Sequence, residues 1–274
     1  MIEKLAAATQ LATFFVRPER RLLGFYYDQH PNVGDVLNVD LADRLLDKEL
    51  VMLPGMRHLP HVLMVGSILG QMNKNSIVWG SGVLSPEIFD QCQGLGTILA
   101  VRGRLTKGLI EKKFDVQLDC PLGDPGLLLP RVYPMPQRSE KQVGIIPHLL
   151  DESSDWVRAM CEQGAKLVSV SLPPEQFVDA LAGCSAVISS SLHGLILADA
   201  YNIPNIRFSL PNPIPGGDFK FDDYYSATTV PLANEDTIRV EPDDTRRLVD
   251  LIAGARVKPY AFDLDDLLAA APRG

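Results

Sequence analysis

The stretch AVISSSLHGLILADAYNIPNIRF, residues 186–208, joins an apolar strand to an apolar helix and then to a second strand. Residues 186–188 predict the end of a buried strand, the run after Gly194 predicts a helix, and residues 205–208 predict the next strand. A short strand–helix–strand order of this kind is typical of a parallel sheet in an α/β protein. We therefore expect an α/β fold.

Three serines and a histidine stand where this strand meets this helix: Ser189, Ser190, Ser191 and His193. The hydroxyls can cap the helix, and Gly194 lets the backbone approach a ligand closely. His193 falls in the first turn, where a bound phosphate or carboxylate would favour the imidazolium form. Two interpretations remain open: a plain helix cap, or an anion site with a proton donor beside it.

The rest of the chain repeats this alternation. Strands are predicted at residues 22–27, 61–65, 76–79, 98–101, 116–118, 143–147 and 166–171, and helices at 36–50, after 102 to about 113, 156–163, 173–182 and 243–255. The proline-rich residues 130–141 predict a linker. The sequence thus predicts two Rossmann-like, doubly wound domains facing across a cleft: residues 1–130 and 142–256, with a linker at 131–141 and a tail at 257–274.

Composition narrows the functional class. The chain has 274 residues, 46% of them hydrophobic and 22% charged, which is ordinary for a soluble globular protein. Its net charge of −8 argues against nucleic-acid binding, which needs a basic surface. The four cysteines lack paired spacing, which favours reduced thiols in a cytoplasmic protein and predicts no metal site.

No stretch approaches 18 uninterrupted apolar residues, so no membrane-spanning helix is predicted. The N-terminal residues 1–21 do predict an amphipathic helix, with Lys4 and Arg17 available to anionic headgroups. Packing on the body of the protein is the first interpretation of this helix. Docking at the cytoplasmic face of the inner membrane is the alternative.

Polar and glycine residues gather at the predicted strand ends, where open α/β sheets bind their ligands. Besides the serine–histidine stretch they are Asp35, Ser67, Gly80, Ser81, Gly82, Arg102, Asp124 and His148. This concentration indicates a cleft enzyme, with Gly80, Ser81, Gly82 and Asp124 as candidate substrate-binding residues.

The charged residues each allow two interpretations. Asp35 is either a helix cap or a carboxylate that accepts a proton, and Asp124 is either a turn former or a site residue. Arg102 directly follows an apolar strand, which favours anion binding over a solvated surface position. Arg207 and Lys220 are further candidate cations for an anionic substrate.

A set of short motifs occurs in one order along most of the chain: NVGD (32–35), WGSG (79–82), AVRG (100–103), GDPG (123–126), SSLHG (190–194) and KFDDYY (220–225). This set resembles the polysaccharide pyruvyl transferases, in particular the bacterial exopolysaccharide ketal-pyruvate transferases. The resemblance implies a glycosyltransferase-B-like arrangement, with phosphoenolpyruvate as the donor substrate and no further cofactor. Such enzymes attach pyruvate as a cyclic ketal across two hydroxyls of a sugar and release phosphate. The acceptor is typically a lipid-linked oligosaccharide at the cytoplasmic membrane face.

The resemblance also implies roles for individual residues. His193, Arg102 and Asp35 match the family's active-site positions, with the acceptor on the N-terminal side and the donor on the C-terminal side. In this reading His193 protonates the donor methylene and Asp35 accepts a hydroxyl proton. Many members carry an arginine two places before the histidine, where this chain has Ser191, so Arg207 or Lys220 would replace that charge.

Two other functions fit the same two-domain plan. One is a sugar-nucleotide-dependent glycosyltransferase, which would bind a nucleotide diphosphate. The other is a non-catalytic sugar-binding protein of a polysaccharide assembly complex. Donor binding separates the three, because only a pyruvyl transferase requires phosphoenolpyruvate.

Overall fold

The computed structural model describes residues 20–52, 58–139, 141–212, 214–241 and 244–272. The predicted N-terminal amphipathic helix lies outside these residues, so both of its interpretations remain predictions. Among the described residues, no helix has the length and apolar character needed to cross a membrane.

The N-terminal half is built on parallel strands in the order β2-β1-β3-β4-β5. A backbone bridge between Gly24 and Val62 joins the β1–β2 pair to the β3–β4–β5 sheet. The strands are β1 (Arg21–Leu23), β2 (Glu49–Val51), β3 (His61–Leu63), β4 (Ser76–Trp79) and β5 (Thr97–Ala100).

The C-terminal half holds a second parallel sheet, in the order β7-β6-β8-β9-β10. Its strands are β6 (Gln142–Ile146), β7 (Lys166–Leu167), β8 (Cys184–Ser189), β9 (Asn205–Ser209) and β10 (Ile238–Arg239). In both halves the second strand lies outside the first, and the third lies on its other side. This order creates a switch point between β1 and β3 and another between β6 and β8, where α/β sheets open a crevice for ligands.

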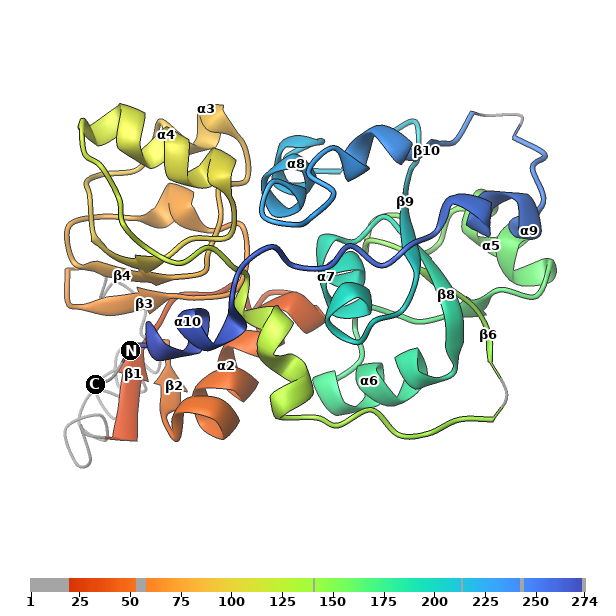
Figure 1. Cartoon of the computed structure of the whole chain (residues 1–274), viewed down its shortest axis with the longest axis horizontal. Coiled ribbons are helices and arrows are strands. Elements are labelled where there is room, and N and C mark those ends of the chain that lie inside the picture. The colour runs from red at the N-terminus through yellow and green to blue at the C-terminus, as the bar shows by residue number, and fades with distance from the viewer. Residues whose placement is uncertain (1–19, 53–57, 140, 213, 242–243, 273–274) are drawn as a thin grey trace, which may run out of the picture.

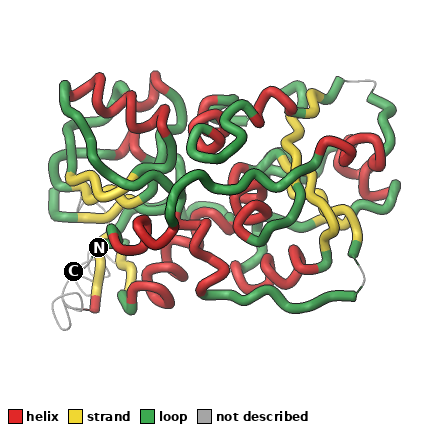
Figure 2. The backbone as a smooth tube through the Cα atoms, viewed as in Figure 1, coloured by secondary structure: helices red, strands yellow, loops and turns green. Residues whose placement is uncertain are grey.

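Helices pack around both groups of strands (Figures 1 and 2). They are α2 (Val33–Leu46), α3 (Pro86–Phe89), α4 (Arg104–Phe114), α5 (Asp155–Glu162), α6 (Pro174–Ala182), α7 (Leu192–Ala200), α8 (Phe219–Tyr225), α9 (Leu248–Leu251) and α10 (Leu264–Ala269). Short 3₁₀ segments are η2 (Leu69–Gln71), η3 (Pro125–Arg131), η4 (Ala233–Asp236) and η5 (Ile252–Gly254). The mixed α/β character and the parallel sheets agree with the sequence prediction.

Several predicted elements differ from the structure. The strand predicted at 166–171 forms only at Lys166–Leu167, because its pairing with β6 ends there, and the strands predicted at 22–27 and 61–65 end at Leu23 and Leu63. The helix predicted at 36–50 ends at Leu46, because Asp47 adopts a left-handed conformation (φ 51°), and the chain then forms β2. No strand forms at 116–118, where the Val116 and Leu118 amides bond back to Glu111. The described part of the last predicted helix begins only at Leu248 and continues into η5.

The C-terminal segment crosses back from the second sheet to the first half of the chain. In Figure 1 it runs from α9 across the molecule to α10. The Trp79 indole Nε1 donates a hydrogen bond to the Leu267 carbonyl (2.8 Å), and both residues are fully buried. The largest hydrophobic cluster contains residues of both halves, such as Met64 and Phe177. The division into domains and the cleft between them remain predictions.

Candidate active site

The first turn of α2 meets the first turn of α7. The Asn32 side chain caps α2 by accepting a hydrogen bond from the Gly34 amide (3.0 Å), so Asp35 is not the capping residue. A Cβ atom at Gly34 would overlap the imidazole of His193. The glycine of the NVGD motif therefore lets the His193 ring pack directly against the backbone beside Asp35.

His193 also faces a buried carboxylate. Its Nε2 lies 3.6 Å from Asp124 Oδ2, and neither atom has a hydrogen-bond partner among the described residues. The other carboxylate oxygen, Asp124 Oδ1, accepts the Gly126 amide hydrogen bond at the start of η3 (2.9 Å). Asp124 is thus a turn former on one side and a partner of the histidine on the other. A small movement would close the pair into a charge-assisted hydrogen bond.

Asp35 can exchange a proton near neutral pH. Burial raises its pKa to about 6, and the nearby His193 opposes part of that rise. A carboxyl group held near the working pH is suited to general base catalysis.

The six sequence motifs form one connected assembly. A Cβ at Gly80 would overlap Pro125 of GDPG, and a Cβ at Gly82 would overlap the Arg102 guanidinium of AVRG. The Ser81 hydroxyl donates to the Gly66 carbonyl (2.8 Å), which ties the WGSG loop to the end of β3. The glycines therefore serve close packing between loops that are distant in sequence.

Arg102 is completely buried, and each of its three guanidinium nitrogens has a protein partner. Nε donates to Asp223 Oδ2 (2.9 Å), Nη1 to Ser67 Oγ (2.7 Å), and Nη2 to the Val83 carbonyl (2.8 Å). Asp223 accepts two more hydrogen bonds, from the Thr106 amide and hydroxyl (2.7 Å each). This network joins the AVRG motif to the KFDDYY motif.

Lys220 lies where the predicted cations come together. Burial, together with charge repulsion from Arg102 and Arg207, lowers its pKa to about 7, while Asp151 opposes the shift. Its ammonium donates to the Pro215 carbonyl (3.0 Å). A lysine close to two arginines forms a locally positive region. A bound anion would offset the repulsion among these positive charges.

Arg207 contacts residues in and around α8. Its Nη1 pairs with Asp218 (2.7 Å) and donates to Asn234 (2.5 Å), while its guanidinium stacks 3.5 Å above the Phe221 ring. Its Nε is buried without a partner among the described residues.

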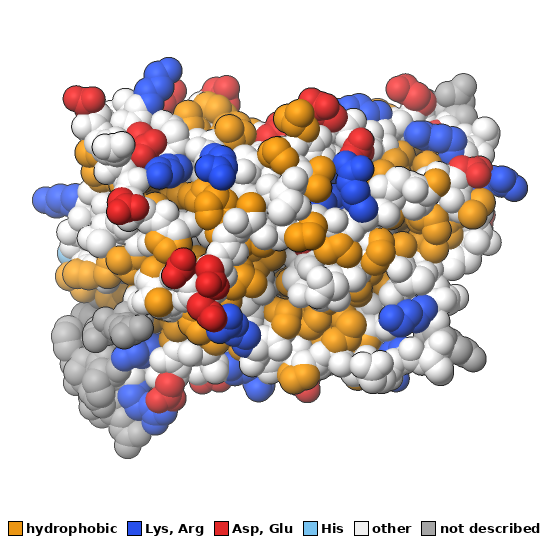
Figure 3. Space-filling model, viewed as in Figure 1, with side chains coloured by type: hydrophobic (Ala, Val, Ile, Leu, Met, Phe, Trp, Pro, Cys, Tyr) orange, Lys and Arg blue, Asp and Glu red, His pale blue; other side chains and the backbone are white. Residues whose placement is uncertain are grey.

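These cations are hidden from the surface. The exposed fractions of Arg102, Arg207 and Lys220 are 0, 3 and 7%. On the face drawn in Figure 3, acidic and basic side chains are interspersed. The positive region is therefore internal and can act on a ligand only within the site.

The three serines have distinct roles in the turn. Ser189 donates to the Ile146 carbonyl (2.6 Å), Ser190 donates to Asp151 Oδ2 (2.6 Å), and Ser191 caps α7 through the Gly194 amide (3.4 Å). The helix-cap interpretation therefore holds for Ser191. Ser189 and Ser190 tie the turn to the end of β6.

Asp151 and Asp223 belong to this arrangement, but the sequence did not single them out. Asp223 lies inside KFDDYY, where two adjacent aspartates gave no reason to choose one. Asp151 follows a strand end by several residues and has no local signal.

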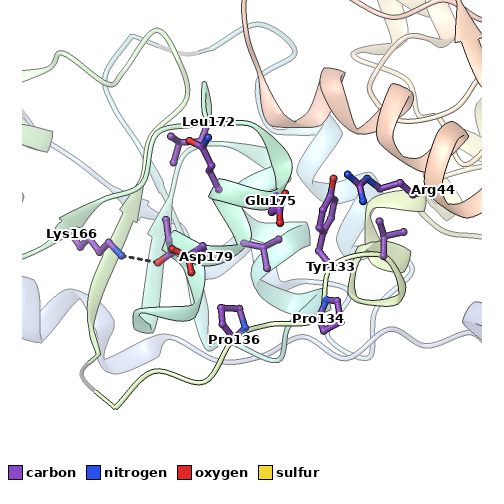
Figure 4. Close-up of a pocket in the computed structure, with 12 residues that line it drawn as sticks. Arg44, Tyr133, Pro134, Pro136, Lys166, Leu172, Glu175 and Asp179 are labelled. Atoms are coloured by element: carbon purple, nitrogen blue, oxygen red, sulfur yellow. Dashed lines mark hydrogen bonds between the residues drawn. The ribbon is translucent and has the colours of Figure 1, made fainter.

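The residues that line the cavity drawn in Figure 4 include none of the motif residues. It has a volume of about 780 Å³ and lies between the end of α2, residues 132–136 and α6, with Arg44, Tyr133 and Glu175 in its lining. Arg44 lies nine residues after Asp35 on α2, roughly 13 Å along the helix axis. The motif residues, and not this cavity, therefore define the candidate site.

Comparison with known proteins shows which family the chain belongs to. A protein of Acanthamoeba polyphaga mimivirus, "Uncharacterized protein L143", is 30% identical over 73% of this chain and 72% of its own length. The "Succinoglycan biosynthesis protein ExoV" of Rhizobium meliloti (strain 1021) is 26% identical over 73% of this chain, and the match spans 62% of ExoV, less than two thirds of its length. The family model for polysaccharide pyruvyl transferase matches residues 20–212, which include Asp35, Arg102 and His193. The chain belongs to the polysaccharide pyruvyl transferase family.

Proposed function

We propose that this chain transfers pyruvate from phosphoenolpyruvate to two hydroxyls of one sugar in a lipid-linked exopolysaccharide repeat unit. The products are a cyclic pyruvate ketal and phosphate. Family membership supports pyruvyl transfer to a polysaccharide. The observation that carries the finer proposal is the placement of His193 against Asp124 and the Asp35 turn. Lys220 supplies positive charge near Asp151, which is bound to Ser190 of the same serine–histidine turn.

The donor is an anion, and the site offers positive charge for it. Phosphoenolpyruvate carries a phosphate and a carboxylate. Lys220 would contact one of these groups directly, with Arg102 and Arg207 adding positive potential behind it. The N-terminal amides of α7 would receive the other group. Because these cations can neutralise the leaving phosphate, the proposal requires no cofactor.

The chemistry needs two proton movements. The first sugar hydroxyl adds to C2 of the donor as its proton passes to Asp35, while His193 delivers a proton to the methylene C3. This step gives a methyl group and a tetrahedral carbon that still bears phosphate. The second hydroxyl then displaces phosphate from C2, and its proton leaves with the departing group. One C–H bond, two C–O bonds and one O–H bond on the released phosphate form, while the carbon–carbon π bond, the C2–O(phosphate) bond and the two sugar O–H bonds break. The proton on Asp35 returns to His193 before the next turnover, and the balance needs no oxidant or reductant.

A ligand-dependent melting experiment tests this proposal. Donor at about 100 times its dissociation constant should stabilise the fold by roughly 2.7 kcal/mol and raise the melting temperature by several degrees. We expect this shift with phosphoenolpyruvate and none with a nucleotide sugar. A shift with the nucleotide sugar alone would instead favour glycosyl transfer, and no shift with either would favour the non-catalytic sugar-binding function.

Donor affinity should fall as the pH rises above 7. Lys220 has a pKa lowered to about 7, so above that pH it loses the charge that attracts the donor. The donor phosphate is fully ionised there, since its second pKa lies near 6. We expect the dissociation constant measured by titration calorimetry to rise about tenfold per pH unit between pH 7.5 and 9.

Lys220→Met provides the control for that titration. The variant should bind phosphoenolpyruvate weakly, with no change over the same pH range. If its pH dependence matched that of the unchanged chain, another group would be responsible; Lys258, whose pKa is lowered to about 8, would be the first to examine.

Gly34→Ala should impair the reaction without unfolding the chain. The new methyl group would occupy the position of the His193 ring and displace it. A displacement of about 1 Å can cost roughly 100-fold in rate, so we expect a loss of that order in pyruvyl transfer. Gly108→Ala on α4 is the matched control, because nothing lies within 4 Å of its added methyl group. Equal rates in the two variants would show that the position of His193 does not matter.

A further inference from the structure

His148 lies at the same sheet edge as His193 but has no role in the steps above. It follows Pro147 at the carboxyl end of β6, whose residue Ile146 pairs in register with Ser189 of β8. β6 and β8 flank the switch point of the C-terminal sheet, where ligands enter α/β folds. His148 therefore follows one of these strands, and His193 lies in the first turn of the helix that follows the other.

The backbone of His148 is fixed to the serine–histidine turn. Its amide donates to Ser190 Oγ (2.8 Å), and Ser190 donates in turn to Asp151 Oδ2 (2.6 Å). This chain of hydrogen bonds holds the imidazole in a defined place beside the start of α7.

The ring presents one nitrogen to a ligand. Its Nδ1 accepts the Leu150 amide hydrogen (3.2 Å), which places the proton of the neutral ring on Nε2. Nε2 has no hydrogen-bond partner among the described residues, and it is not fully buried. An N–H donor thus remains available at the crevice.

His148 is neutral at physiological pH. Burial and the adjacent Lys220 ammonium lower its pKa to about 4. It cannot act there as a second charged acid, but a neutral N–H adds a directional contact without adding to the repulsion among Lys220, Arg102 and Arg207. A neutral donor next to crowded cations is suited to an anionic oxygen.

We propose that His148 binds the phosphate group of the donor through Nε2–H, as an uncharged partner of Lys220. The inference rests on the proposed function and identifies a contact within it. The phosphate is the more highly charged end of the donor, so it belongs where the three cations converge.

The test is titration calorimetry of His148→Ala, His148→Gln and the unchanged chain with phosphoenolpyruvate, inorganic phosphate and pyruvate. A hydrogen bond to a charged group predicts that the alanine variant loses roughly tenfold or more in affinity for phosphoenolpyruvate and phosphate. Its affinity for pyruvate should stay unchanged. Glutamine, which places an amide N–H near the position of Nε2, should restore most of the loss.

His58→Asn, at the opposite end of the first sheet next to β3, is the matched control and should bind all three ligands like the unchanged chain. Nitrogen NMR shifts of His148 should also show a neutral ring with the proton on Nε2 at pH 7. Unchanged phosphate affinity in His148→Ala, or a loss confined to pyruvate, would overturn the inference while the proposed function stands. If the unchanged chain bound neither phosphoenolpyruvate nor phosphate, both would fail.

Discussion

Replacing His193 by Asn should lower the rate of pyruvyl transfer by roughly 10²–10⁴, the range that a positioned general acid contributes. The physical reason is that carbon C3 of the donor must gain a proton, and an amide cannot deliver one. Asn is smaller than His but keeps a polar, uncharged side chain at the start of α7, so donor binding should change far less than turnover. The measurement is kcat and KM for the two proteins at pH 6.5, with the melting temperature as a check on folding.

The values of kcat and KM distinguish a catalytic role of His193 from a role in binding or folding. A fall in kcat with little change in KM would mark an interaction made only in the transition state. A variant that folds and turns over like the unchanged chain would remove His193 from the mechanism.

The second large effect concerns stability. Arg102 and Asp223 are both completely buried, and Arg102 Nε lies 2.9 Å from Asp223 Oδ2. The Thr106 hydroxyl donates a hydrogen bond to the same carboxylate. Asp223→Ala would leave the guanidinium charge in the interior without its partner, which typically costs about 3–5 kcal/mol. We therefore expect a large fall in the urea midpoint, or failure to accumulate folded protein.

Asp250→Ala is the comparison for this experiment. Its carboxylate pairs with Arg247 at the surface of α9, where both side chains are exposed, so the unfolding midpoint should not change. Equal midpoints for Asp223→Ala and the unchanged chain would mean that the buried pair does not support the fold.

Sequence patterns predicted the helices and strands whose bounds are set by neighbouring residues, and missed some whose bounds are set by distant contacts. β4 was predicted with its observed bounds, because a short apolar run ends there at a glycine turn with nothing competing. β2 was missed, because Asp47 ends α2 in a left-handed conformation that sequence usually signals with glycine. α10 was missed because it is short and its position depends on Trp79, far away in the sequence.

In the candidate site too, local sequence predicted individual residues but not the contacts between residues that are distant in the chain. Residue types at strand ends pointed to Asp35, Asp124 and His193, and the structure brings these three side chains together. The sequence could not show that Arg102 is paired with Asp223, 121 positions later. Nor could it show that Asp151 faces Ser190, since both contacts exist only after the chain has folded.

Mass spectrometry of an acceptor saccharide measures pyruvyl transfer itself. Lipid-linked repeat-unit oligosaccharides would be incubated with the protein and phosphoenolpyruvate, and released phosphate would be measured in the same reaction. We expect the saccharide to gain one pyruvate ketal per phosphate released, and His193→Asn nearly to abolish both signals. A saccharide that stays unmodified with phosphoenolpyruvate, but gains a sugar when a nucleotide sugar is supplied, would contradict the proposed pyruvyl transfer.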